Sequence, residues 1–135
     1  MKIYTSDYKR SVDVGTGSVW NSVYSTAATY LSDSDKVFLQ YGLDFLKSGK
    51  CAADDTQITA RQMELIQRRF AKIAPMDAVW DMSNPSQRGP WPRGISSNVT
   101  SCANLYTTAD GKDLFLEIIS LLKYAAAADT DVLVT

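Results

Sequence analysis

The titratable side chains decide which chemistry this chain can perform. It contains no histidine, the commonest general base near neutral pH and the commonest ligand of transition metals. Catalytic triads and zinc sites that depend on histidine are therefore excluded. The two cysteines, Cys51 and Cys102, are too few for a four-thiolate metal site or a disulfide scaffold. We expect both thiols to be reduced, with Cys102 as a small core residue and Cys51, in a polar connection, as the more accessible thiol. No metal or cofactor is expected to be bound.

Carboxylates are the remaining candidates for acid–base chemistry, with thirteen aspartates and two glutamates in the chain. A catalytic pair or a magnesium site requires carboxylates that converge within a few ångströms, and no spacing in this sequence has that signature. Four aspartates lie at predicted helix starts, where negative charge opposes the helix dipole: Asp33, Asp35, Asp110 and Asp113. Four others lie in polar connections, where they can meet a basic partner: Asp54, Asp55, Asp129 and Asp131. No catalytic residue is predicted.

Residues 76–98 contain the side-chain types that dominate interface hot spots. These are Trp80, Asp81, Arg88, Trp91 and Arg93. The two tryptophans and three prolines of this segment argue against a flexible linker, because each indole carries a large apolar area that favours burial. The segment is predicted to be a long structured loop. Its tryptophans either bind a partner or hold the loop on the body of the protein, and the sequence leaves both interpretations open.

Charge is unevenly distributed along the chain, although the total is only −1. Residues 1–59 carry a net charge of −1, residues 60–95 of +3 and residues 96–135 of −3. A basic stripe of Arg61, Arg68, Arg69 and Lys72 could contact phosphate, but a sequence pI of about 5.3 opposes nucleic-acid binding as the main role. The segregation predicts a bipolar surface if the third helix and the loop of residues 76–98 lie on one side of the molecule.

The elements that must position these side chains begin with two short alternating segments, residues 2–5 and 11–14. Their period of two predicts strands that pair as a hairpin across residues 7–10. A third strand is predicted over residues 99–108, which are uncharged and rich in threonine, and it would pair with Ile3. Residues 132–134 are either a short strand or a frayed end.

Apolar residues at helical spacing predict four longer helices. The first begins after the glycines at 15 and 17, with Ser18 as its N-cap. The second begins at the acidic residues 33–35 and ends at Gly49. Apolar side chains occupy most of its faces, so it is predicted to be central.

The third helix has the clearest start signal. Thr59 is its predicted N-cap, Gln62 completes a capping box, and Ile58 faces Met63 as a hydrophobic staple. The apolar stripe that this helix should bury consists of Met63, Ile66, Phe70 and Ile73. The helix should end before Pro75. The last helix is predicted to be capped by Asp110 and to bury a wide apolar face.

Together these elements predict one α+β domain over residues 1–135, mainly helical, with about four longer helices. A small antiparallel sheet is formed by the amino-terminal strands and residues near 101–107. Residues 14–32 carry no charge over a length near that of a bilayer span, but ten of them are glycine, serine, threonine or asparagine, so no membrane span is expected. The amino terminus lacks the apolar region of a secretory signal, and a cytoplasmic location is therefore expected.

The run from Gly89 to Phe115, 27 of 135 residues, resembles the immunity protein 70 family of bacterial polymorphic-toxin and contact-dependent growth inhibition systems. The similar features are Pro90-Trp91, Ile95-Ser96, Thr100-Ser101, Ala103-Asn104 and the segment from Asp110 to Phe115. The family's Trp-Gly is replaced by Trp91-Pro92. The resemblance implies a non-enzymatic antidote that binds one cognate toxin domain, such as a nuclease, and covers its active site or its substrate path.

Three functions follow as hypotheses. The first is an immunity protein that contacts its toxin through the acidic connections or through the loop from Trp80 to Arg93. The second is a small carboxylate- or metal-dependent enzyme, which would show a stoichiometric divalent-metal site. The third is a bacterial adaptor with no toxin partner, which genomic neighbourhood or affinity purification would distinguish from the first.

Overall fold

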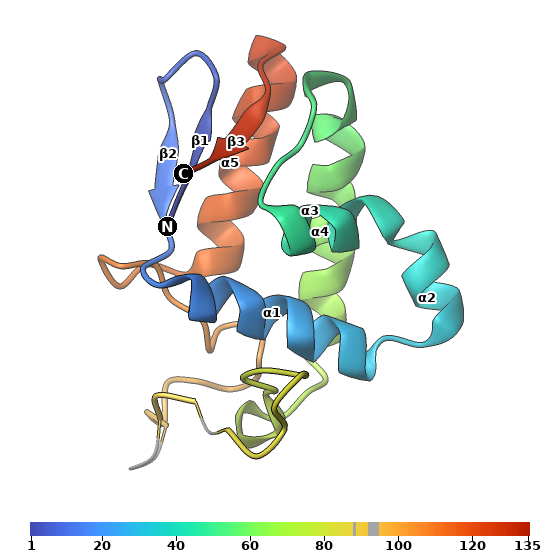
Figure 1. Cartoon of the computed structure of the whole chain (residues 1–135), viewed down its shortest axis with the longest axis vertical. Coiled ribbons are helices and arrows are strands. Elements are labelled where there is room, and N and C mark those ends of the chain that lie inside the picture. Colours follow the sequence, from blue (N-terminus) through green and yellow to red (C-terminus); the bar gives the residue numbers. More distant parts are fainter. Residues whose placement is uncertain (88, 92–94) are drawn as a thin grey trace.

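The computed structural model describes residues 1–87, 89–91 and 95–135 (Figure 1). Its strands are β1 (Lys2–Thr5), β2 (Ser11–Asp13) and β3 (Val132–Val134). Its α-helices are α1 (Gly17–Tyr30), α2 (Asp33–Phe38), α3 (Gln40–Ser48), α4 (Thr56–Phe70) and α5 (Leu114–Ala128). Short 3₁₀ turns occupy Ala53–Asp55 and Pro75–Asp77. Within the described residues, four longer helices and a small antiparallel sheet confirm the α+β prediction.

Helices α4 and α5 lie side by side and run in opposite directions, and α1 crosses in front of them (Figure 1). The aromatic centre of the core is Phe70, whose ring lies 5.1 Å from that of Phe115 and 6.5 Å from that of Tyr106. All three side chains are buried. Three residues of the predicted stripe, Met63, Ile66 and Phe70, are buried on α4, whereas Ile73 lies beyond the end of the helix and is half-buried.

The sheet has the order β2-β1-β3, with both pairs antiparallel. Ile3 lies opposite Val12 on one side and Val134 on the other, so the predicted hairpin is confirmed. The prediction that residues 99–108 pair with Ile3 is wrong, because β3 occupies that place. At the end of α5, Asp129 adopts a left-handed conformation with φ of 52°, and the chain turns back there toward β1.

Residues 99–108 form a series of turns that covers the core. The Asn104 side chain accepts hydrogen bonds from the backbone N–H groups of Thr100 and Ser101, at 3.0 and 3.2 Å, and thereby stabilises a turn in place of a strand. Cys102 and Tyr106 are buried, so the apolar and uncharged composition of residues 99–108 reflects their burial against the core and not a strand. Burial also raises the pKa of the Cys102 thiol to about 11, in agreement with its predicted role as a small core residue.

The single helix predicted from residue 33 to Gly49 is divided into α2 and α3 at Leu39. The side chain of Gln62, on α4, explains the break. Its Oε1 accepts the N–H of Gly42 at 2.9 Å, and its Nε2 donates to the carbonyl of Phe38 at 3.1 Å. Gly42 permits this approach, because a Cβ there would lie 2.7 Å from Ile66 Cδ1. Gly49 ends α3 with φ of 75°, as predicted.

The central position predicted for the second helix is correct only for α3. Phe45 and Leu46 of α3 are buried, whereas no residue of α2 is buried. Val37 and Phe38 are 76% and 66% exposed. The apolar residues of α2 are therefore exposed, although their spacing around the helix predicted burial. The physical reason is that the break at Leu39 directs α2 away from the core.

The predicted capping box of the third helix is wrong, because α4 begins at Thr56 and contains both Thr59 and Gln62 in its interior. The 3₁₀ turn Ala53–Asp55 leads directly into α4, so the helix starts one turn earlier than the capping signal predicts. Ser18 and Asp110 are likewise not N-caps. Thr16 precedes α1, and the Asp113 side chain caps α5 by accepting the N–H of Leu116 at 3.1 Å.

We predict that Gln62→Ala lowers the free energy of unfolding by about 1–3 kcal/mol, because it leaves the buried N–H of Gly42 without a partner. Urea denaturation measures the change. Gln57→Ala, at an exposed position of the same helix, is the matched control and should have a much smaller effect. Equal losses in the two variants would show that the Gln62 amide does not stabilise the break.

Candidate partner-binding site

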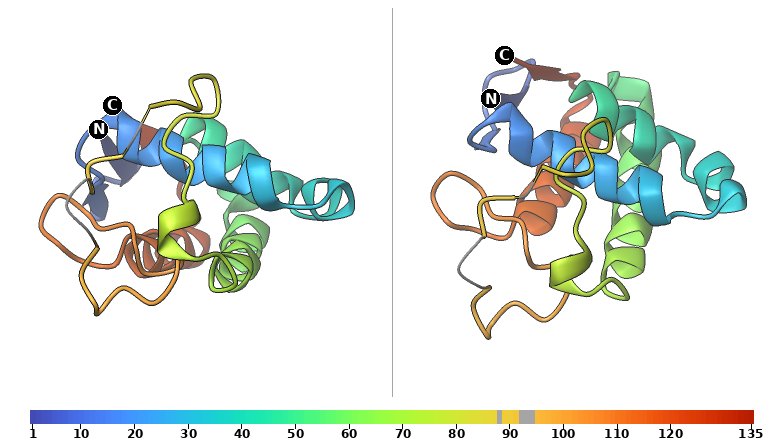
Figure 2. Two further views of the ribbon diagram at one scale, coloured as in Figure 1. Left: turned by 90° about the horizontal axis from the view of Figure 1, so that it is seen from below. Right: turned by 60° about the horizontal axis from the view of Figure 1, so that its bottom comes forward.

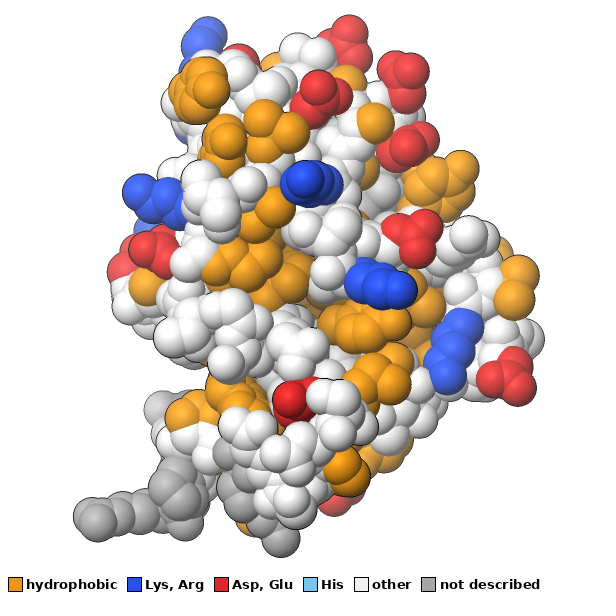
Figure 3. All heavy atoms as spheres, in the orientation of Figure 1, with side chains coloured by type: hydrophobic (Ala, Val, Ile, Leu, Met, Phe, Trp, Pro, Cys, Tyr) orange, Lys and Arg blue, Asp and Glu red, His pale blue; other side chains and the backbone are white. Residues whose placement is uncertain are grey.

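The four aspartates of the predicted acidic connections lie at one end of the molecule. We call Asp54, Asp55, Asp129 and Asp131 the acidic end. Because α4 begins where α5 ends, the 3₁₀ turn before α4 meets the segment after α5 (Figure 1). The Asp131 Oδ1 accepts the N–H of Ala53 at 2.8 Å, which joins the two segments. Acidic side chains gather on the surface of this end (Figure 3).

Three of these four side chains are exposed, and Asp55 is half-buried. Ion pairs in the described part of the chain join Arg69 to Asp35, Lys112 to Asp110 and Lys123 to Glu64. None of them includes an aspartate of the acidic end. The four carboxylates therefore lie at one end of the molecule with their charges available to a partner.

The β1–β2 hairpin turn adds a fifth carboxylate that the sequence analysis did not select. Ser6 accepts the N–H of Asp131 at 3.0 Å, and Asp7 donates its own N–H to Thr130 at 3.1 Å, so the turn is tied to the acidic end. The Asp7 carboxylate accepts the Tyr124 hydroxyl at 2.6 Å and the Thr5 hydroxyl at 2.7 Å. Tyr124 lies 117 positions away, and no local pattern indicates this contact.

These hydrogen bonds, from Tyr124 first and then from Thr5 and the Lys9 N–H, lower the pKa of Asp7 to about 2. Because the folded-state value lies below the unfolded value, the carboxylate stabilises the fold above pH 4, and this stabilisation is lost as the pH falls toward 2. We predict that Asp7→Asn makes the urea midpoint less dependent on pH between 4 and 2. Identical pH profiles for the two proteins would contradict this.

The aromatic loop, which we define as residues 75–87, 89–91 and 95, lies at the opposite end of the molecule (Figure 1). The rings of Trp80 and Trp91 meet edge to face at 5.5 Å, and Trp91 contacts Tyr106 at 6.0 Å. Both indoles are half-buried beside a groove of about 520 Å³. Hydrogen bonds from Ser83 lower the pKa of Asp81 in the same loop. Arg88 and Arg93 lie outside the described residues.

The aromatic loop lies against α1 (Figure 2), and buried hydroxyls of that helix hold it in place. Ser22 donates to the Val79 carbonyl at 2.7 Å, and Thr26 accepts the Val79 N–H at 2.9 Å. The Tyr106 hydroxyl lies 3.0 Å from both of these side-chain oxygens, and burial raises its pKa to about 12. The buried hydroxyls of Ser22 and Thr26 therefore attach the loop to α1. The described part of the chain contains no helix that is long and apolar enough to cross a membrane.

The predicted partner-binding residues thus form two separate surfaces, the acidic end and the aromatic loop. Among residues 1–87, 89–91 and 95–135, no three cysteine or carboxylate side chains are grouped so that they could hold a metal ion. Cys51 is half-buried and is the more accessible thiol, as expected, since Cys102 is fully buried. Desolvation, opposed by the Thr59 hydrogen bond, raises the pKa of Cys51, and this disfavours a reactive thiolate.

Comparison with known proteins gives one match. A family model described as Immunity protein 70 matches residues 2–134. No curated protein and no solved structure matches the chain.

Proposed function

The chain belongs to the immunity protein 70 family, and from this membership we propose that it binds one cognate toxin domain and neutralises it without catalysing a reaction. The toxin is a nuclease whose nucleic-acid-binding surface is basic, and the immunity protein covers its active site or its substrate path. Neutralisation takes place in the cytoplasm, as part of a polymorphic-toxin or contact-dependent growth inhibition system.

The acidic end is the observation that carries the choice of contact surface. Its four carboxylates come from two segments that are distant in sequence, and none is in an ion pair among the described residues. A nuclease needs Lys and Arg to contact phosphates, so such a toxin offers the complementary charge. Attraction between the acidic end and the basic surface of the toxin would accelerate encounter.

The aromatic loop is the second candidate surface. Trp80 and Trp91 are already accounted for by contacts with each other and with Tyr106, whereas the carboxylates of the acidic end have few internal partners. We therefore place the toxin on the acidic end. Trp80→Ala should then leave toxin binding unchanged, provided that the variant remains folded.

The direct test is co-expression of this chain with the carboxy-terminal domain of the protein encoded immediately upstream in its own genome. Rescue of growth, together with co-purification of the two proteins, would support the proposal. If the upstream domain is toxic and this chain is folded, failure of both rescue and co-purification would overturn it.

An enzymatic role is tested separately by calorimetric titration with magnesium, manganese and calcium. A specific stoichiometric site would favour the alternative of a metal-dependent enzyme. Absence of binding of all three cations, together with growth rescue, would favour the antidote.

A further inference from the structure

The two edges of the sheet differ in how much of their backbone is paired. On the β3 edge, Val132 and Cys51 exchange hydrogen bonds, with N···O distances of 3.0 and 2.8 Å. The segment from Gly49 to Cys51 thus covers that edge. On the other side of the sheet, β2 is the outermost strand (Figure 1).

The hairpin pairing shows which backbone groups of β2 point away from β1. Thr5 donates to the carbonyl of Arg10, and Val14 donates to the carbonyl of Met1. Hydrogen bonds in an antiparallel pair alternate from residue to residue, so the backbone groups of Ser11 and Asp13 face outward. The Asp13 carbonyl accepts the N–H of Ala109 at 2.8 Å. Within the described part of the chain, the two outward N–H groups and the Ser11 carbonyl have no partner.

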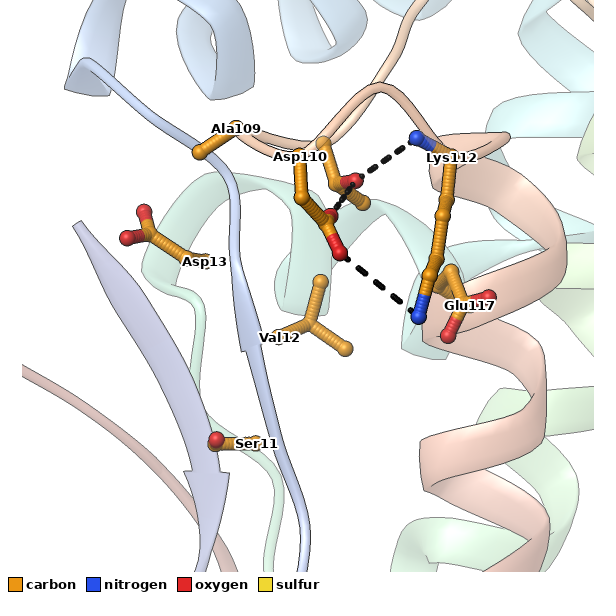
Figure 4. A pocket seen from close by; sticks show the side chains of 8 residues that line it. Ser11, Val12, Asp13, Ala109, Asp110, Lys112 and Glu117 are labelled. Carbon is orange, nitrogen blue, oxygen red and sulfur yellow. Dashed lines mark hydrogen bonds and ion pairs between the residues drawn. The ribbon is translucent and has the colours of Figure 1, made fainter.

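An open groove of about 420 Å³ lies along this edge. Its other wall is formed by residues 108–112 and by Glu117 of α5 (Figure 4). Asp110 and Glu117 lie on that wall, with the Lys112 ammonium between them, 3.5 Å from the Asp110 carboxylate. The Asp13 carboxylate points away from this wall and accepts the N–H of Gly15 at 2.9 Å. Two carboxylates and one lysine give this wall a net negative charge.

We propose that the β2 edge pairs with an extended segment of the toxin that carries Lys or Arg opposite Asp110 and Glu117. This inference rests on the proposed function and adds a contact to it. The three outward groups without a partner, the N–H groups of Ser11 and Asp13 and the Ser11 carbonyl, would form the main-chain hydrogen bonds of an added strand, and the two carboxylates would select its side chains. The Ala109 N–H, already bonded to this edge, shows that a neighbouring chain segment can approach it.

Charge decides between a toxin segment and a second copy of this chain. Two copies that paired through β2 would each bring a net negative wall to the interface, and like charges at close range are unfavourable. A basic segment meets no such repulsion. The β2 edge also follows directly from the hairpin turn that is tied to the acidic end, so one partner can contact both.

The test uses the complex with the upstream-encoded toxin domain and follows amide hydrogen exchange by NMR. The amides of Ser11 and Asp13 should exchange at least about 100-fold more slowly in the complex than in the free chain. The amide of Val12, which faces β1, is the internal reference and should change much less.

Two variants separate backbone pairing from charge. Ser11→Pro removes an outward N–H and should weaken toxin binding by about tenfold or more, whereas Ser11→Ala, which retains the N–H, should bind normally. Glu117→Lys should weaken binding by about tenfold, and Asp44→Lys, at an exposed position on α3, is its control. If Ser11→Pro does not fold, the comparison of Glu117→Lys with Asp44→Lys still tests the inference.

Each outcome has a separate meaning. Protection of both amides together with the predicted weakening supports the added strand. A stable complex without protection at Ser11 and Asp13 overturns this inference and leaves the proposed function intact. Absence of any complex overturns the proposed function, and the inference with it. Protection that appears in the free chain as its concentration rises would assign the edge to a second copy and overturn the toxin segment.

Discussion

Neutralising the acidic end will weaken toxin binding by about tenfold for each pair of aspartates and by about a hundredfold for all four. The pairs are Asp54→Asn with Asp55→Asn, and Asp129→Asn with Asp131→Asn. Asparagine keeps the side-chain oxygen that accepts the Ala53 N–H at position 131. It also tolerates the left-handed conformation at position 129, where φ is 52°. The substitutions therefore remove charge with little change in local structure.

Binding kinetics at two ionic strengths provide the measurement. The loss should lie largely in the association rate and should shrink at high salt, because screening already weakens long-range attraction there. Asp33→Asn with Asp44→Asn removes the same number of charges from exposed positions outside both candidate surfaces and is the matched control. Unchanged affinity in both acidic-end pairs would show that the contact lies elsewhere, and a loss on Trp80→Ala would then locate it at the aromatic loop.

Phe70→Ala will lower the free energy of unfolding by about 3–5 kcal/mol, the cost typical of removing a buried aromatic ring. Phe70 is fully buried, and it packs edge to face against Phe115 of α5. It also contacts Tyr106, so it joins α4 to α5 and to the turns of residues 99–108. The substitution creates a cavity at the point where these three segments meet.

The matched control is Phe38→Ala, which removes the same atoms from a side chain that is 66% exposed. Its effect on the free energy of unfolding should be within about 0.5 kcal/mol, as is usual for surface positions. Urea denaturation of both variants, with the midpoint and slope fitted, measures the difference. Similar losses in the two variants would contradict the assignment of Phe70 as the centre of the core.

The sequence predicted those elements whose signals are local. Alternation identified the hairpin strands, a glycine marked the end of α3, and helical spacing gave the buried stripe Met63, Ile66 and Phe70. The family was also identified correctly from the resemblance of residues 89–115, and the family model extends it to residues 2–134. All these signals lie within a few residues of the feature that they predict.

The errors came where distant contacts outweighed local preference. The capping box at Thr59 and Gln62 was a sound local signal, but Gln62 bonds to Gly42 and Phe38, far away in the sequence. Residues 99–108 had the composition of a strand, but the Asn104 side chain stabilises a turn there and β3 pairs with β1. Neither competing partner is visible in a local pattern.

The sequence by itself determined the α+β class and the number of longer helices. Tertiary structure alone decided that Asp54 and Asp55 lie beside Asp131, that the aromatic loop lies at the opposite end, and that the β2 edge is open. The physical reason is that helix and strand preferences depend on neighbouring residues. A binding surface depends instead on which helix ends and sheet edges come together when the apolar faces are buried.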